Sequence, residues 1–354
     1  MIDIDGSHME GGGQILRTAL ALSTLTRQPF VIKKIRHHRP RPGLKAQHLS
    51  CIDALKRLAS AEVQGAQLGA PELSFNPQAV VPGKLALDIG TAGSITLLLQ
   101  SLLLPCMFAD GVIKLSITGG TDTKWSIPAD YFAHVILPFL NKFALVEIDN
   151  LRRGFYPRGQ GKLELTITPR FRFEQFKNFD AFHTHLRSHV APMQFAMQPE
   201  LDHIEGSSVA SFKLKGAEVA ERQAAAAVRI LGDHFPLRIE KEYCHSASVG
   251  TVMTLWAVSR QSIAFMGADA LGEKGRRAEE VGAAAANCLL NLLQSDAAVD
   301  SHLADNLIPL MALCGGEIKT KKITGHIQSN IYVCEKFLKV GFRVQEKENN
   351  VIVD

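Results

Sequence analysis

The chain has 354 residues, of which 46% are hydrophobic and 21% are charged, and its formal net charge is +4 at pH 7. This composition excludes a disordered or low-complexity chain, and the length predicts two or more compact units with sizeable cores. Basic residues nevertheless cluster at 33–45 and 151–162, where they suit either a phosphate-bearing partner or a solvated surface.

The N-terminal stretch DGSHMEGGGQILR (5–17) contains letters that a cleaved affinity tag often leaves behind. It follows MIDID, whose isoleucines and aspartates alternate as in a half-buried strand, and it precedes apolar residues at helical spacing. We therefore interpret it as a native strand, glycine-rich loop and helix. Glycines at a helix start can direct N–H groups at an anion, and Glu10 could hold a metal that shares a bound phosphate. A tight turn with a solvated Glu10 fits the loop equally well.

Two further glycine-rich loops, 88–94 and 117–130, follow along the chain. The first opens ITLLLQSLLLPCMFA (95–109), which is too short and too polar to span a bilayer, so we expect a buried helix. Its Gln100 fits a structural role better than a ligand contact. Neither a Walker A loop nor a dinucleotide fingerprint is present. Glycine turns at several helix starts favour one phosphate-rich ligand, although short α/β connections need such turns too.

One pattern recurs: a helix end, an alternating strand, a polar turn and a second alternating strand. It is clear at 54–75, 139–167 and 337–354, and weaker at 229–258. Recurrence predicts an α/β (α+β) chain built from repeated small βα units that cannot bury a core alone. The weakest copy lies within 176–266, which we interpret as a smaller inserted domain.

Cysteine and histidine usage points to an intracellular chain without an obvious metal centre. The six cysteines form no CxxC pair and are typical of reduced, mostly buried residues in a cytoplasmic protein. His183, His185 and His189 lie in the predicted insert, where the HxH spacing could ligate a metal, but no third ligand is evident. His326, in KITGHIQSN, follows a glycine and precedes a predicted helix. A neutral imidazole there could attack phosphorus without a separate base.

Taken together, several of these stretches resemble the RNA 3'-terminal phosphate cyclase family, whose motifs they follow in order. The resemblance covers nearly the whole chain outside the insert. The stretches that carry it are DGSHMEGGGQILR (5–17), IRHHRPRPGLKAQHL (35–49), GTAGSITLLLQ (90–100), GGTD (119–122), RGFYPRGQG (153–161), HLADNLIPLMAL (302–313) and GHIQSN (325–330).

The resemblance implies a discontinuous large domain, 1–175 and 267–354, of three units similar to the C-terminal domain of translation initiation factor three. The smaller inserted domain would occupy 176–266. It also implies ATP as co-substrate, Mg²⁺ or Mn²⁺, and an RNA with a 3'-phosphate end as partner, with no membrane and no obligatory protein partner. His326 would take AMP from ATP, pass it to the RNA 3'-phosphate, and the vicinal 2'-OH would then close a 2',3'-cyclic end.

The family's site residues map onto this chain by position. Glu10 resembles the metal-binding acid, and Arg17, Arg36, Arg39 and Gln47 resemble residues at the phosphate end. The ATP pocket would be formed by Gln100, Pro128, His302, Leu303, Ala304, Asp305 and Asn306. Arg158 and Gln160 stand where glycines are usual, His302 replaces a tyrosine, and Asn306 replaces a glutamine. These departures bear on nucleotide affinity and base preference more than on the class of reaction.

Two other functions fit parts of the pattern. A non-catalytic relative that binds RNA or protein in ribosomal RNA processing would keep the fold and lose the adenylated histidine. The presence of His326 together with Glu10, Arg17 and Asp305 favours the enzyme. A small-molecule transferase of similar repeated fold is the third possibility, and the basic cluster and the His326 motif argue against it.

Overall fold

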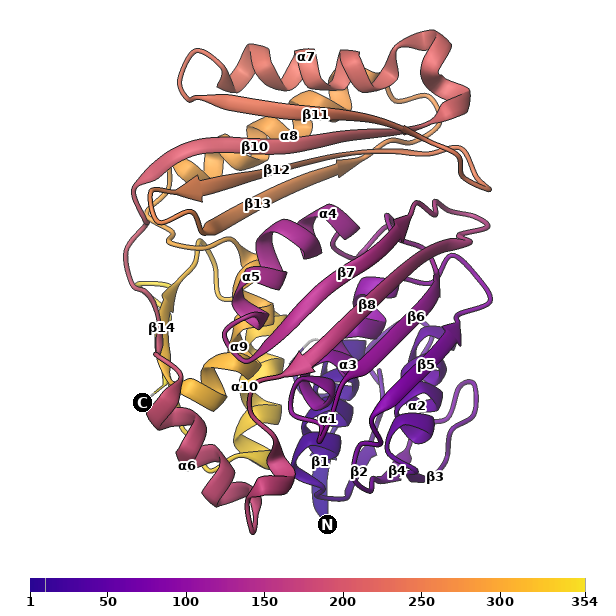
Figure 1. Ribbon diagram of the computed structural model, residues 1–354, viewed down its shortest axis with the longest axis vertical. Coiled ribbons are helices and arrows are strands. Elements are labelled where there is room, and N and C mark those ends of the chain that lie inside the picture. The colour runs from indigo at the N-terminus through magenta and orange to yellow at the C-terminus, as the bar shows by residue number, and fades with distance from the viewer. Residues whose placement is uncertain (10, 354) are drawn as a thin grey trace.

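The computed structural model describes residues 1–9 and 11–353 and shows a mixed α/β chain (Figure 1). In these residues the strands form four four-stranded sheets, which confirms the α/β class. None of the described helices combines the length and the apolarity that crossing a bilayer requires.

The first sheet shows how the N-terminal stretch folds. Its strands have the order β1-β2-β4-β3, with β1 parallel to β2 and the other pairs antiparallel. Gly6 follows β1, and its N–H donates to the Lys33 carbonyl at 2.7 Å. A Cβ added to Gly6 would lie 2.8 Å from that oxygen, too close for any other residue to fit without a shift. The GSHM letters are thus packed as part of the fold. The elements are β1 (Ile2–Asp5), α1 (Gly13–Thr26), β2 (Phe30–Lys33), α2 (Ala46–Leu58), β3 (Glu62–Gln64) and β4 (Leu73–Asn76).

The second sheet repeats that order as β5-β6-β8-β7, again with its first two strands parallel. Its first helix, α3 (Ile95–Met107), is the buried helix expected at 95–109, because a helix that is apolar on all sides must be covered on all sides. The other elements are β5 (Gly83–Asp88), β6 (Ile113–Gly119), α4 (Ala129–Tyr131), the π-helix η1 (Phe132–Ile136), α5 (Leu137–Leu140), β7 (Ala144–Arg152) and β8 (Gly161–Pro169).

The third sheet has the same order, β9-β14-β16-β15, although its first two strands are far apart in sequence. All three clear copies of the repeated pattern therefore form a helix end followed by an antiparallel strand pair. The elements are η2 (Phe173–Gln175), α6 (Phe179–His189), β9 (Met193–Phe195), α9 (Ser301–Cys314), β14 (Gly316–Lys319), α10 (Gly325–Phe337), β15 (Phe342–Gln345) and β16 (Asn350–Val353).

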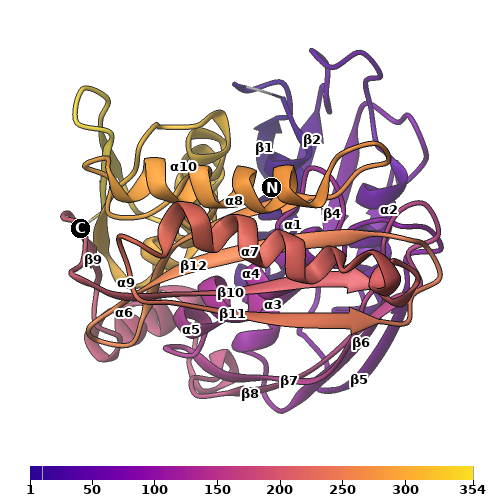
Figure 2. The same ribbon diagram turned by 90° about the horizontal axis from the view of Figure 1, so that it is seen from above.

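The fourth sheet is connected differently. Its order is β11-β10-β12-β13, so the first strand in sequence is internal and the two strands of the weak copy at 229–258 are not neighbours. Helices α7 and α8 cover one face of this sheet, and α4 and η1 contact the other (Figure 2). The elements are β10 (Leu201–Ser211), η3 (Phe212–Ala217), α7 (Val219–Leu231), β11 (Leu237–Cys244), β12 (Thr251–Ser259), β13 (Ala264–Leu271) and α8 (Ala278–Leu293).

Both ends of the expected insert, 176–266, pack with other parts of the chain, and the domain bounds stay a prediction. The polar, aromatic-rich stretch at its start is an aromatic cluster, in which Phe182 packs against Phe108 in the large core, and β9 pairs with β14. At the other end, α8 belongs to the core of the fourth sheet. The segment that builds this sheet and its core therefore runs from about Leu201 to Ala297.

The three similar sheets place their helix starts together. Strands β1, β2, β5, β6, β9 and β14 are the parallel strands of these sheets. The loops after five of them lead into α1, α2, α3, α4 and α10, whereas β9 is followed by β10, and α9 follows α8. In the interior, α1 lies against α3 and α10. Ligands in α/β folds commonly bind beyond the carboxyl ends of parallel strands, where helix N-termini converge. Apart from Glu10, which lies outside the described residues, every site residue expected from the sequence lies in one of these loops, in the helix after it or in α9.

Candidate functional site

His326 lies in the first turn of α10, where a carboxylate orients it. The Thr324 hydroxyl caps the helix by accepting from the Ile327 N–H at 3.1 Å, and it donates to Asp305 at 2.9 Å. The other oxygen of Asp305 lies 3.4 Å from His326 Nδ1, with the imidazole 44% exposed and the carboxylate 10% exposed. A carboxylate at Nδ1 favours the tautomer with its proton there, so the reactive lone pair is on Nε2.

A buried chain of amides connects this histidine to α1. The Asn330 side chain donates to the Asp305 carbonyl at 2.7 Å and accepts from Gln14 at 3.0 Å and from Thr18 at 2.6 Å. These groups are almost inaccessible to solvent. Because buried polar networks are rigid when every member is satisfied, α1 and α10 hold a fixed relation at the site.

Arg17 continues the chain and brings a buried positive charge to the site. Its guanidinium donates to Gln14 at 2.7 Å and to Gln100 of α3 at 2.9 Å. Among residues 1–9 and 11–353, Arg17 forms no ion pair with a carboxylate, and its burial lowers the pKa of the guanidinium. Buried arginines are usually paired with an anion, so this arrangement fits a bound phosphate.

The glycine loop before α1 is packed against further cationic side chains. A Cβ on Gly13 would lie 2.3 Å from His48 Nε2 and 2.9 Å from Arg17 Nη1, and one on Gly12 would lie 3.4 Å from Arg39. Only glycine leaves room for these groups to reach the loop. Burial, followed by the charges of Arg17, Arg36 and Lys45, lowers the pKa of His48 to about 3, so this histidine is neutral near pH 7.

Arg36 adds a second cation with an incomplete hydrogen-bond set. Its Nε is buried and has no hydrogen-bond partner among the described residues, and burial together with the charge of Arg39 lowers its pKa. Arg17, Arg36 and Arg39 therefore share one anion-attracting region beside the glycine loop. Gln47, one residue before His48, instead donates to the Ser94 carbonyl at 3.0 Å, so it lies at the glycine-rich loop 88–94.

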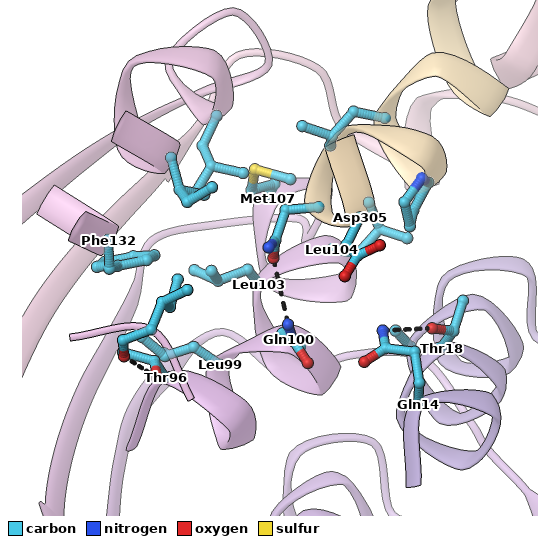
Figure 3. A pocket seen from close by; sticks show the side chains of 17 residues that line it. Gln14, Thr18, Thr96, Leu99, Gln100, Leu103, Leu104, Met107, Phe132 and Asp305 are labelled. Atoms are coloured by element: carbon cyan, nitrogen blue, oxygen red, sulfur yellow. Dashed lines mark hydrogen bonds between the residues drawn. The ribbon is translucent and has the colours of Figure 1, made fainter. Parts of the chain in front are cut away.

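A cavity of about 60 Å³ lies beside Gln100 and extends between α1, α3, η1 and α9 (Figure 3). Gln100 donates to Asn306 at 3.4 Å across one end, and Asp305 lines the cavity as well. Apolar side chains, including Phe132, form the rest of the wall. Pro128 is buried at the start of α4, between two cavity-lining segments. The space is too small for a nucleobase without movement of its walls.

The remaining expected residues of α9 divide into exposed and buried sets. His302 is exposed in the first turn, with its ring perpendicular to that of Tyr131 at 6.0 Å, and its carbonyl accepts from Asn306 at 2.7 Å. Leu303 and Ala304 are fully buried in the core. Their side chains thus contribute packing, while Asp305, expected in the ATP pocket, is the partner of His326.

Glu10, the expected metal ligand, lies outside the described residues. Within residues 1–9 and 11–353, no group of three or more histidine, cysteine or acidic side chains is placed to hold a metal ion. That includes the histidines of α6, where His185 and His189 stack at 3.9 Å while His183 faces the Ala312 carbonyl. All six cysteines are free, and four of them are buried, as expected.

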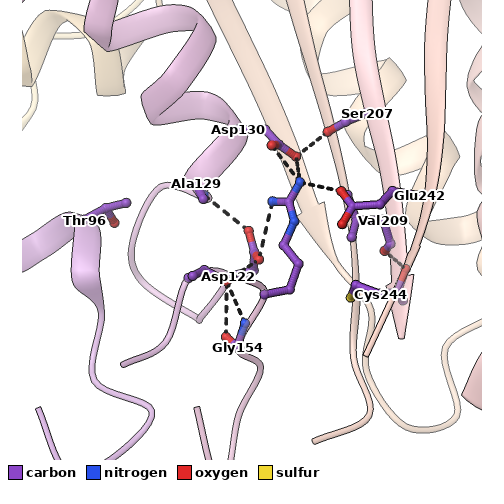
Figure 4. Close-up of polar contacts among 12 residues, drawn as sticks. Thr96, Asp122, Ala129, Asp130, Gly154, Ser207, Val209, Glu242 and Cys244 are labelled. Atoms are coloured by element: carbon purple, nitrogen blue, oxygen red, sulfur yellow. Dashed lines mark hydrogen bonds and ion pairs between the residues drawn. The ribbon is translucent and has the colours of Figure 1, made fainter. Parts of the chain in front are cut away.

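One arginine of the second basic cluster is buried, while Arg152 and Arg158 are exposed. Arg153 is 5% exposed and pairs with Asp130 at 2.8 Å, with Glu242 of β11 at 2.8 Å and with Asp122 at 3.8 Å (Figure 4). Ser207 of β10 also donates to Asp130, which joins the second and fourth sheets. Arg153 therefore fixes two parts of the structure together and does not face a partner.

Sequence reasoning did not single out Gln14, Thr18, Thr324 and Asn330, or assign a role to His48. A signal for the first two was present, because Gln14 and Thr18 are polar residues one turn apart in a helix that is buried almost throughout. Asn330 stood in the GHIQSN motif without an assigned role. The partnership of Asp305 with His326 joins residues twenty-one positions apart in sequence, and spacing alone gives no sign of it.

Comparison with known proteins identifies relatives of this chain. The family described as RNA 3'-terminal phosphate cyclase matches residues 8–344. A protein of that name from Pyrococcus furiosus is 42% identical, with 98% of this chain and 95% of that protein covered. Another from Archaeoglobus fulgidus is 42% identical over the full length of both chains, and one from Pyrococcus abyssi is 43% identical over 96% of this chain and 93% of its own.

Proposed function

This chain belongs to the RNA 3'-terminal phosphate cyclase family, and from that premise we propose that it converts an RNA 3'-terminal phosphate into a 2',3'-cyclic phosphodiester in an ATP-dependent reaction. AMP and pyrophosphate are the other products. The observation that carries the proposal is the continuous network from His326 through Asp305, Asn330 and Gln14 to the buried Arg17. It combines an oriented nucleophile with a buried cation that forms no ion pair with a carboxylate of residues 1–9 and 11–353.

In the first step, Nε2 of His326 attacks the α-phosphorus of ATP. A P–N bond forms, the P–O bond to the β-phosphate breaks, and pyrophosphate leaves. Positive charge develops on the imidazole as the bond forms, and the carboxylate 3.4 Å from Nδ1 stabilises it. The guanidinium of Arg17 is placed to neutralise charge on the phosphate oxygens.

The second and third steps pass the nucleotide on. An oxygen of the RNA 3'-phosphate attacks the same phosphorus, the P–N bond breaks, and an RNA–adenylate forms. The vicinal 2'-OH then loses its proton and attacks the terminal RNA phosphorus, which releases AMP and closes the ring. Histidine suits this relay because its P–N bond is reactive and its leaving ability improves on protonation.

The proposal assigns the nucleotide to the cavity beside Gln100 and Asn306. These two amides can hydrogen-bond a base edge, and the exposed His302 can stack on it. Pro128 would border the same space. Arg36, Arg39 and Gln47, with the glycine loop, would contact the phosphates of ATP and RNA.

A divalent cation fits this scheme with few protein ligands. Mg²⁺ commonly keeps several waters and binds through one or two carboxylates together with substrate phosphates, so Glu10 with ATP would suffice. When bound, the cation would neutralise charge on the triphosphate. The absence of a preformed cluster of three ligands among the described residues agrees with such a site.

We also propose that the first three sheets are units similar to the C-terminal domain of translation initiation factor three. Their shared strand order supports this, as does the helix that follows each leading parallel pair. The fourth sheet has another connectivity, so the inserted domain would be a different small α/β unit.

Incubation with α-labelled ATP and Mg²⁺, followed by denaturation, tests the covalent step. We expect label on the wild-type chain and none on His326→Ala, whereas the control His189→Ala, at an exposed position of α6, should label normally. Label that persists in His326→Ala would refute the assignment. No label on the wild type would favour a non-catalytic RNA- or protein-binding relative. Cyclisation is tested separately by incubating the enzyme and ATP with an RNA that ends in a 3'-phosphate. A cyclised end resists removal by a phosphatase, whereas an unreacted 3'-phosphate does not.

A further inference from the structure

A large cleft lies between the second sheet and the inserted segment. Its volume is about 750 Å³, within the range of about 300–1,000 Å³ typical of ligand pockets. The loops after β6 and β7 line one side, and the loops before β12 and after β13 line the other. The network around His326 and Arg17 does not use this space.

Two aromatic side chains on separate loops are exposed in the cleft. Trp125 is 94% exposed and Tyr156 is 75% exposed, and both line the cleft. The only other tryptophan, Trp256, is 5% exposed and stacks on His134. Trp125 also has a φ of +62°, a conformation that is strained for a bulky residue. Strained, exposed aromatic residues are typical of binding surfaces.

Both aromatic loops are anchored at their bases. Asp122, three residues before Trp125, is buried, accepts from Thr121 at 2.7 Å and lies 3.8 Å from Arg153. Phe155, next to Tyr156, is buried in a small apolar cluster between the two parts of the structure. The rings are therefore exposed on fixed supports, an arrangement that reduces the entropy lost on binding.

Helix α3 contributes residues both to the cleft and to the proposed phosphate site. Ser94 and Leu97, in and just before the first turn of α3, line the cleft, and Gln100 contacts Arg17 one turn later. Three residues of helix rise about 4.5 Å. Gln47, expected at the phosphate end, also lines the cleft. A chain with its terminal phosphate at Arg17 can therefore enter the cleft with its preceding residues.

The charges in the cleft are nearly balanced. Lys124 pairs with Glu273 at 3.0 Å, Lys274 contributes one more cation, and Asp122 faces Arg153. The four charged side chains that line the cleft sum to zero, so charge alone cannot hold a phosphodiester chain there. Stacking on aromatic rings would have to supply most of the binding, and stacking is independent of base identity.

We propose that this cleft binds the unpaired nucleotides that precede the 3'-terminal phosphate of the RNA, with bases stacked on Trp125 and Tyr156. The inference rests on the proposed function, because it takes the RNA end to be at Arg17 and His326. It makes Trp125 and Tyr156 substrate-binding residues that determine how affinity depends on RNA length and on single-strandedness.

Length dependence of the cyclisation KM provides the test. The KM for cyclisation is compared among single-stranded substrates of one to six nucleotides with a 3'-phosphate. Each rate is divided by the fraction of enzyme that is adenylated, so that differences in adenylation do not enter the comparison. For the wild type we expect KM to fall with length. Trp125→Ala and Tyr156→Ala should each raise KM for the longer substrates by about 5- to 150-fold, the effect of one lost stacking contact. Phe212→Ala, an exposed aromatic outside the cleft lining, is the control and should behave as the wild type.

Trp125→Phe separates stacking from structural damage. It keeps a ring that can stack, so it should restore KM to within a few fold of the wild type. In the wild type, we expect RNA to quench the fluorescence of Trp125. Trp125→Phe leaves the buried Trp256 as the remaining tryptophan, so this quenching should disappear. A Trp125→Ala enzyme with wild-type length dependence would overturn the proposal, and so would a Trp125→Phe enzyme as weak as Trp125→Ala.

The outcomes distinguish this inference from the proposed function. A wild-type enzyme that is adenylated and cyclises RNA with a KM independent of length refutes the cleft while the function stands. A wild type that is never adenylated refutes the function. In that case, quenching of Trp125 fluorescence by single-stranded RNA still supports the cleft, and no quenching refutes it too.

Discussion

Arg17→Met is expected to separate catalysis from stability. The substitution keeps much of the side-chain length and apolar packing but removes the buried guanidinium. Two hydrogen bonds are lost, at 2.9 Å to Gln100 and at 2.7 Å to Gln14. Hydrogen bonds from a charged donor contribute about 1.5–3 kcal/mol each. Against this stands the desolvation of the buried guanidinium, which forms no ion pair within the described part of the chain, and this desolvation costs several kcal/mol.

These opposing contributions nearly cancel in the folded protein, so we expect the free energy of unfolding to change by no more than about 2 kcal/mol. Catalysis has no such compensation. Loss of one preorganised donor to transition-state charge typically lowers a rate by about 10²–10³-fold. Adenylation of His326 should therefore fall by that factor. Arg17→Lys, which keeps the charge but loses the planar fork, should be intermediate.

The assay pairs two measurements on the same preparations. The rate of labelling by α-labelled ATP reports catalysis, and urea unfolding reports stability. Labelling by Arg17→Met within threefold of the wild-type rate would refute the role of Arg17 at the phosphate. A loss of more than about 4 kcal/mol in unfolding free energy would show instead that the guanidinium is a structural group, because its desolvation would then not offset its two hydrogen bonds, which contribute about 3–6 kcal/mol together.

Three further predictions follow from the geometry of the site. Asp305→Asn keeps the shape beside His326 but removes the charge, so labelling should fall by about 10²-fold or more with a normal melting temperature; a wild-type rate contradicts the orienting role. Gly13→Ala should slow labelling at least tenfold because its Cβ would meet His48 and Arg17, whereas the control Gly216→Ala, with open space around it, should not. The pKa of His48 is lowered to about 3, below its unfolded value of about 6.5, so its contribution to stability is fully present above pH 6.5 and is lost as the pH falls toward 3. In His48→Asn, the unfolding free energy from urea titrations should lose part of that pH dependence, on the order of 5 kcal/mol between pH 3 and 6.5, of which about 3 kcal/mol lies between pH 4 and 7. An unchanged slope would show that other groups cause it.

Local patterns in the sequence determined much of the fold. The alternation in MIDID and the helical spacing after the glycines predicted β1 and α1, and the apolar run at 95–109 predicted the buried α3. The three clear copies of the repeated pattern became three sheets of one strand order. Such features depend on periodicity within ten to thirty residues, which local backbone geometry expresses directly.

The expected insert packs at both ends through distant contacts instead. Composition placed its start in the aromatic-rich stretch after residue 170, yet Phe182 packs against Phe108, so this stretch belongs to the large core. The weak fourth copy had the right elements in the wrong spatial order, because β10 lies between β11 and β12. A pattern of strands does not state which strands pair, and only the tertiary structure decides that.

The candidate site shows the same division. The sequence by itself determined the kind of chemistry, through His326, the arginines of the basic cluster and the glycine loop. Tertiary structure decided which of these groups meet and in what state. It placed Asp305 against His326, buried Arg17 between two amides, kept His48 neutral and turned Arg153 away from the site into an ion network. Burial and charge neighbours come from packing between helices far apart in the chain, so residue types and spacing could not specify them.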